Sequence, residues 1–171
     1  MSVPTVDFLQ EMLDALWAHI EGDARFTALG LKVYKLTDGR SLPITQNGGI
    51  AHVDLPACFV DAIRPSFGDG RTEPRRWEIN VEVPISLAFA NTQTHTSHVM
   101  LDCSRALMTF QLILGNRAAI QSRLGSSGVI TDFSLEMGEV QPVLEPNGRA
   151  INFWVAELTV TLKRTFNPPA S

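Results

Sequence analysis

Hydrophobic and polar residues alternate most strictly in the middle of the chain, between Trp77 and Phe89. The apolar members occupy every second position: Trp77, Ile79, Val81, Val83, Ile85, Leu87 and Phe89. Such alternation predicts a β-strand with one buried and one solvent-facing side. At about 3.3 Å per residue this strand would be roughly 40 Å long, well beyond the usual strand of about 5–6 residues. Because Pro84 has no N–H to donate, we expect an edge or a bulge at that position.

Two further strands are predicted near the C-terminus, from Val129 to Val140 and from Ala150 to Phe166. In the second of these, the apolar residues change from odd to even positions near Ala156 and Glu157. Either a β-bulge at that point or a segment that is apolar on both faces would explain the change.

Two segments show helical spacing of apolar residues. The first runs from Val6 to Glu21, with Asp7 and Glu11 in its early turns, where the helix dipole favours acidic side chains. The second begins near the capping candidates of residues 94–97 and ends at Leu114. An apolar stripe on each helix indicates that one side packs on a core.

The remaining segments give weaker patterns. Short strands are predicted at Leu31–Leu36 and Pro56–Ile63, and a short helix at Arg117–Leu124. The polar stretch Arg64–Arg76 contains two prolines and two glycines and is predicted to be a loop, as is Ser41–Asp54.

The order of these elements predicts the α+β class. We expect an antiparallel or mixed sheet with two main helices packed on one face, and long strands that extend as a β-hairpin arm. The 171 residues fit a single domain, 1–171, in which residues 166–171 form a disordered tail.

Composition narrows the classes of function. Hydrophobic residues make up 44% and charged residues 19%, which is typical of a folded domain. The net charge of −4 gives no reason to expect nucleic acid or an anionic membrane as the main partner. Cys58 and Cys103 lack the spacing of a zinc or redox site, so we expect buried thiols. We find neither a signal peptide nor an apolar run of membrane-spanning length, and we expect an intracellular, soluble protein.

The candidate for catalytic chemistry is a group of His95, His98 and Asp102, which can share one side of a helix. Two imidazoles and a carboxylate could ligate a metal ion, and a metal-dependent enzyme is therefore an alternative hypothesis. A hydrated helix N-terminus carrying histidines is the commoner situation. The sequence has no nucleophile motif and no phosphate-binding loop. We therefore expect a protein that is not an enzyme and has no cofactor.

The basic residues concentrate in one place, at Arg64, Arg71, Arg75 and Arg76. They form either a solvated loop or a contact loop whose guanidinium groups pair with carboxylates or phosphates. The predicted strands are also longer than the diameter of the core of a small domain. Their ends would therefore project beyond the core and pair with another subunit. Glu78, Glu82, Lys163 and Arg164 would either guard such edges or contribute to an interface.

The order of elements resembles that of the tail terminator (tail completion) proteins of tailed bacteriophages. The resemblance covers nearly the whole chain: the N-terminal helix, the Pro-led strand Leu55–Val60, the polar loop, the strand Trp77–Phe89, the helix with Ser104-Arg105-Ala106-Leu107, and the strand Asn152–Val160. The resemblance implies a virion protein of the tail or neck, assembled in the host cytoplasm. Its partners would be copies of itself in a ring, usually of six, the tail tube protein and the head–tail connector protein. DNA would pass through the lumen of the ring.

The resemblance implies no catalytic residue. The candidate interface residues are Arg64, Arg71, Arg75, Arg76, Trp77, Glu78, Glu82, Trp154, Lys163 and Arg164. The long Leu36–Asp54 region and the Arg64–Arg76 insertion depart from the family pattern and leave another neck, minor tail or tail-tube protein as an alternative. A small-ligand-binding domain has no distinctive sequence feature in its favour.

Overall fold

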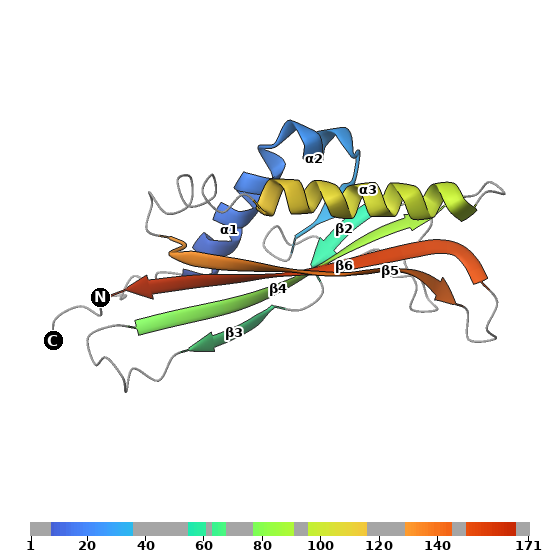
Figure 1. Ribbon diagram of the computed structural model, residues 1–171. Helices are drawn as coiled ribbons and strands as arrows, with labels where there is room; N and C mark the ends of the chain where they lie inside the picture. The colour runs from blue at the N-terminus through green and yellow to red at the C-terminus, as the bar shows by residue number, and fades with distance from the viewer. Residues whose placement is uncertain are drawn as a thin grey trace, which may run out of the picture.

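A six-stranded, mostly antiparallel sheet carries three helices on one of its faces, as the computed structural model shows (Figure 1). The structure describes residues 8–35, 55–60, 63–67, 77–90, 96–115, 129–144 and 150–166. In chain order the elements are α1 (Phe8–Glu21), α2 (Ala24–Ala28), β1 (Lys32–Tyr34), β2 (Ala57–Val60), β3 (Arg64–Phe67), β4 (Trp77–Ala90), α3 (Thr96–Leu114), β5 (Asp132–Leu144) and β6 (Ala150–Phe166). The predicted α+β class is confirmed.

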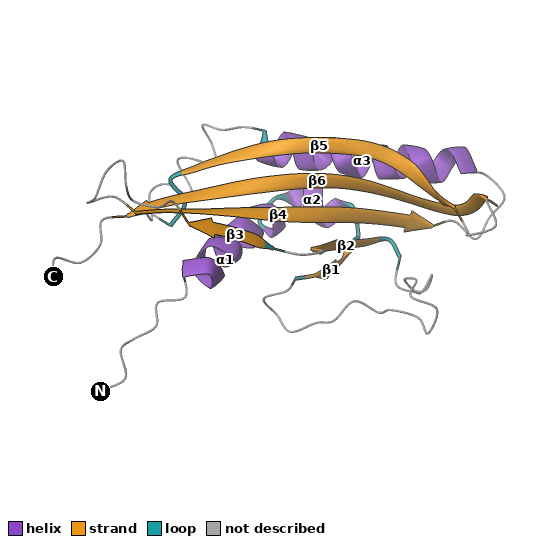
Figure 2. Ribbon diagram, turned by 90° about the horizontal axis from the view of Figure 1, so that it is seen from below, coloured by secondary structure: helices purple, strands orange, loops and turns teal. Residues whose placement is uncertain are grey.

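The strands follow the order β1-β2-β4-β6-β5, and β3 pairs with β4 on the same side as β2. Of the strand pairs in the described part of the chain, only β1 and β2 are parallel to each other. Viewed from the side opposite the helices, β4, β6 and β5 are the long strands of the sheet, and β5 lies along its edge (Figure 2). Beyond the end of β4, the β5–β6 pair continues only through residues 150–152 of β6, so the expected hairpin arm is a short extension.

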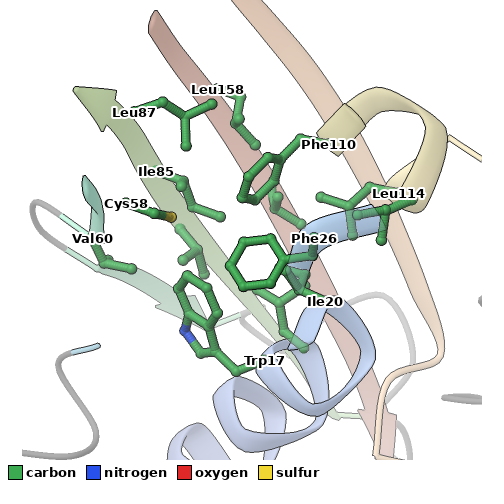
Figure 3. Close-up of a cluster of buried hydrophobic side chains, with 14 of the residues drawn as sticks. Trp17, Ile20, Phe26, Cys58, Val60, Ile85, Leu87, Phe110, Leu114 and Leu158 are labelled. Carbon is green, nitrogen blue, oxygen red and sulfur yellow. The ribbon is translucent and has the colours of Figure 1, made fainter. Parts of the chain in front are cut away.

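The core lies between the helices and the central strands. Apolar side chains of α1 and α3 meet those of β4 and β6, and Trp17 and Phe110 are the largest that are fully buried. Figure 3 shows Phe110 between Phe26 of α2 and Leu158 of β6. The two phenyl rings stand edge to face with centroids 5.5 Å apart. This arrangement is the one that the quadrupoles of aromatic rings favour, so it ties α2 to α3.

Helix α2 was missed by the sequence analysis. It has five residues, too few for a periodic pattern to be recognised. Its N-cap is Asp23, whose carboxylate accepts hydrogen bonds from the backbone N–H of Arg25 and from the Arg25 guanidinium. The guanidinium lowers the pKa of Asp23 to about 2.

The irregularity expected at Pro84 is present on one side of β4. Val60 of β2 lies opposite Ile85, whereas Arg64 of β3 lies opposite Glu82. Three residues of the sequence, 61–63, separate Val60 from Arg64, whereas only two residues of β4, Val83 and Pro84, separate Ile85 from Glu82. The pairing along this side of β4 is therefore interrupted next to the proline. This break accommodates the missing N–H within a strand that is otherwise paired on both sides.

Of the two explanations for the change of parity near Ala156 and Glu157, a bulge of β6 against β4 is not found, because β6 pairs with β4 in one continuous register from Phe153 to Phe166. The segment is instead apolar on both faces, with Trp154 against the core and Val155 on the other side. The β5–β6 pair has register shifts between Met137 and Val140 and between Pro142 and Leu144. At the first of these shifts, Gly138 approaches the backbone so closely that an added Cβ would lie 2.6 Å from the carbonyl oxygen of Glu157. Only glycine permits this approach without a shift of the backbone.

Two other expectations need correction. The first four residues of the predicted loop Arg64–Arg76 form β3, which pairs antiparallel with residues 79–82 of β4. Strand β5 begins three residues later than predicted and continues through Pro142. The expectations for Ser41–Asp54, residues 68–76, Arg117–Leu124 and residues 167–171 lie outside the described residues.

Candidate interaction surfaces

The face of the sheet opposite the helices is seen in Figure 2, and we call it the open face. Most of its described side chains are polar, as the strand registers show. The register places these side chains together on it: Glu78, Asn80 and Glu82 of β4, Glu157, Thr159, Thr161, Lys163 and Thr165 of β6, Ser134 and Glu136 of β5, and Arg64 and Ser66 of β3. Where β2 meets β4, the same face is apolar and buried, at Ala57, Phe59 and Ala88. The polar part can meet solvent or another protein.

Ion pairs connect neighbouring strands across the open face. The Lys163 ammonium lies 2.7 Å from the Glu78 carboxylate, which also accepts a hydrogen bond from the Asn80 amide. The pair between Arg64 and Glu82 is looser, at 3.8 Å, and the Arg64 side chain is 74% exposed. Such exposed pairs contribute little to stability, about 0–1 kcal/mol each, so these charges remain able to contact a partner.

Four of the ten candidate interface residues meet on the open face, namely Arg64, Glu78, Glu82 and Lys163. Trp77 begins β4, but its side chain lies outside the described residues, as do Arg71, Arg75 and Arg76. The other two, Trp154 and Arg164, lie on the opposite face, under the helices. The structure therefore does not bring the ten residues together into one surface.

Arg164 is anchored inside the protein. Its guanidinium donates a 2.6 Å hydrogen bond to the Glu11 carboxylate of α1 and lies 4.6 Å from the centroid of the Phe8 ring. Only 14% of the Arg164 side chain is exposed, and its buried Nε has no hydrogen-bond partner among the residues that the structure describes. These contacts fasten the beginning of α1 to the end of β6.

Trp154 also packs inward. It is half-buried against the core, and it lies opposite Phe89 in the β4–β6 register. Its position explains the apolar character of this part of β6 without a partner molecule.

The long strands β4 and β6 are interior strands. β6 pairs with β4 on one side and with β5 on the other, while β4 pairs with β6 and with β2 and β3. Within the described residues, the middle of β4 is therefore largely paired on both sides, and only its ends, Trp77–Glu78 and Phe89–Ala90, have β6 as their single partner strand. The prediction that strand ends pair with another subunit stays a prediction. β5 forms one edge of the sheet, and β1 and β3 lie toward the other.

The sequence analysis missed a group of acidic side chains at the β5 bulge. Glu139 and Glu157 line a hollow of about 230 Å³ together with Gln141, Pro142 and Val155. Neither carboxylate has an ion-pair partner within the part of the chain that the structure describes. Since the two glutamates belong to different strands, only the observed register could have brought them together.

The outward side of α3 carries another feature that the sequence analysis missed. Leu101, Met108 and Leu112 are 46%, 62% and 59% exposed and lie on one stripe, opposite the buried side of the helix. Their spacing of seven and four residues is helical and could have been found in the sequence. Exposed apolar side chains in a row are typical of contact surfaces.

The metal-site hypothesis finds no assembled ligand set. Asp102 pairs with Arg105 at 3.1 Å, His98 lies near the beginning of α3, and His95 lies outside the described residues. Among the described residues, no three side chains of His, Cys, Asp or Glu come together as a metal ion would require.

Both cysteines are buried, free thiols. Burial raises the pKa of the Cys103 thiol to about 12 and also raises the pKa of Cys58. Cys58 lies within the core cluster drawn in Figure 3. A thiol held in its neutral form is a poor nucleophile.

Comparison of the sequence with models of known protein families, and with curated proteins, finds no match. Of the helices in the described part of the chain, none is both long and apolar enough to cross a membrane.

Proposed function

We propose that this chain is a structural subunit that assembles with copies of itself, and that it acts as a tail terminator of a tailed bacteriophage. In this role a ring of subunits caps the tail tube and joins it to the head connector. The role needs surfaces for protein partners and needs no catalytic group.

The observation that carries the proposal is the order and length of the elements. Helix α1, the Pro-led strand β2, the long strand β4, helix α3 and the long strand β6 follow one another as in the family that the sequence resembles. Strands β4, β5 and β6 have 14, 13 and 17 residues, and each is more than twice the usual length.

The surfaces of the subunit also support the proposal. One face of the sheet is polar and charged, the edge strand β5 has a partner on one side only among the described residues, and α3 exposes an apolar stripe. Unprotected edges and apolar stripes lead to unwanted association unless a partner covers them. A subunit of a ring has such partners on both sides.

Electron microscopy of the purified protein separates this proposal from its nearest alternative. A tail terminator should form closed rings of one size, whereas a tail-tube protein should form filaments that lengthen with concentration. A protein that remains a monomer, both alone and with isolated tail tubes, would contradict the proposed function.

A further inference from the structure

The outer edge of β5 is open along half of its length. Asp132–Met137 pairs with β6 in a regular register, and no described segment pairs with the other side of this stretch. The features that protect edges lie in the second half of β5, where the bulge at Gly138 and the proline at Pro142 interrupt the ladder. The first half is therefore able to accept another strand over about 20 Å.

The side chains of this half favour association. Phe133, Leu135 and Met137 point to the helix side, and each is only half-buried against the core. A strand added at the edge would cover the exposed part of this apolar row, as happens when extended segments bind a sheet edge.

The two sides of the sheet carry opposite charges. Strand β5 contains Asp132, Glu136 and Glu139 and no basic residue. On the other side, Lys32 is the only charged residue of β1 and Arg64 is the only charged residue of β3. Like charges on directly opposed strands are destabilising and opposite charges are favourable, so β5 is a poor partner for a second β5 and a good one for the basic side.

The register places the two complementary strands at the same level of the sheet. Arg64 lies opposite Glu82 of β4, Glu82 lies opposite Thr161 of β6, and Thr161 lies opposite Ser134 of β5. If a second copy is placed beside the first in the same orientation, its Arg64 comes level with Ser134. Asp132 and Glu136 flank Ser134 on the same face and are within diagonal reach of a long side chain.

The strand directions also match. β3 is antiparallel to β4, whereas β5, which is antiparallel to β6, runs in the same direction as β4. Copies repeated side by side with the helices on the same face would therefore bring β5 and the next β3 together as an antiparallel pair. Antiparallel pairing is the slightly more stable arrangement per residue.

We propose that the Asp132–Met137 edge of β5 binds the β3 edge of a second copy of this chain. This inference rests on the proposed function and identifies the contact between its subunits. The contact joins two different edges, so repetition gives a ring if the rotation between copies closes. Each contact is short, because β3 has four residues and Pro65 offers no N–H. A closed ring, in which every subunit is held at both edges, is thus favoured over an open dimer.

Charge reversal tests the contact. Glu136→Arg and Arg64→Glu should each raise the concentration at which the closed species forms by about 5- to 30-fold, because an attractive cross-strand pair becomes repulsive. The double variant should restore assembly to within about threefold of the unchanged protein. The matched control is Asp14→Arg, an exposed acidic residue on α1 that belongs to neither the open face nor a sheet edge, and this variant should assemble normally.

Native mass spectrometry over a concentration series gives the readout, and circular dichroism checks that each variant keeps its fold. Rings that form equally well in both single variants, or that are not restored in the double variant, would overturn the β3–β5 contact and leave the proposed function standing. A change with Glu136→Arg and none with Arg64→Glu would show that β5 binds a different surface, and would also overturn the inference. A protein that never assembles, with or without tail tubes, removes the proposed function and this inference together.

Discussion

Replacing Arg164 tests whether this side chain holds the fold together or serves contacts between molecules. Arg164→Met keeps an apolar stem of similar length and removes the guanidinium that Glu11 and Phe8 contact. Sequence analysis placed Arg164 in the candidate interface, whereas the structure places it beneath α1. The two interpretations predict different results.

The expected loss follows from the contacts. The Glu11 carboxylate is 46% exposed, so we assign about 0.5–1 kcal/mol to the ion pair after screening by solvent. The guanidinium above the Phe8 ring adds about 0.5–1 kcal/mol. The free energy of unfolding should therefore fall by about 1–2 kcal/mol, which lowers the Tm by about 2–8 °C for a chain of this length.

Thermal unfolding followed by circular dichroism measures the loss. Lys163→Met is the matched control: it removes the neighbouring charge on the open face, where the Lys163 side chain is 38% exposed, and should lower stability by less than about 0.5 kcal/mol. Glu11→Gln removes the ion pair and leaves the contact of Arg164 with Phe8, so it should destabilise the protein by about 0.5–1 kcal/mol, and the double variant by less than the sum of the two losses. An Arg164→Met protein as stable as the unchanged protein but defective in assembly would refute the structural role.

Three further predictions concern the core and the titrating groups. Phe110→Ala should lower the free energy of unfolding, measured by urea denaturation, by about 3–5 kcal/mol, because it leaves a cavity and removes the ring that Phe26 contacts. A loss below about 1 kcal/mol would mean that this ring is not at the centre of the core. Cys58 and Cys103 should not react with a thiol reagent at pH 8 while the protein is folded and should both react in urea; rapid labelling of the native protein would contradict their burial. Asp23 has a lower pKa in the folded chain than the ordinary value near 3.9, so its contribution to stability is complete above about pH 4 and is lost as the pH falls toward about 2. Asp23→Asn should therefore make the free energy of unfolding depend less on pH in this range. An unchanged dependence on pH would count against the lowered pKa.

The sequence predicted the elements whose pattern is local. Trp77–Phe89 alternates strictly because one side of β4 faces the core along its whole length, and the prediction is confirmed to within one residue. The bounds of β6 agree with those predicted, and α3 ends at the predicted Leu114. In each case the burial of one side imposes a period that can be read without knowledge of the neighbours.

Features that depend on neighbouring strands were not predicted. The change of parity in β6 left a bulge and a segment apolar on both faces as alternatives, and the pattern of β6 alone did not show that the extra residue is in β5, where Gly138 passes close to the Glu157 carbonyl. Strand β3 was interpreted as a loop because Pro65 is a poor strand residue, although at the edge of a sheet a proline is tolerated.

The candidate interface was divided for the same reason. Lys163 and Arg164 are adjacent in sequence and lie on opposite faces of the sheet, since successive side chains of a strand alternate. Which face is open depends on where the helices pack, and which strand is the edge depends on the order of pairing. Neither is contained in the pattern of a single strand, so the open edge of β5 became visible only in the assembled sheet.

The mass of the purified, untagged protein in solution tests the central claim most directly. Native mass spectrometry across a concentration series should show one closed species, about 113 kDa for six copies of the 18.8 kDa chain, that does not grow as concentration rises. A mass that increases without limit would indicate a filament and contradict a terminator. A mass of one chain at every concentration, unchanged when tail tubes are added, would contradict self-assembly altogether.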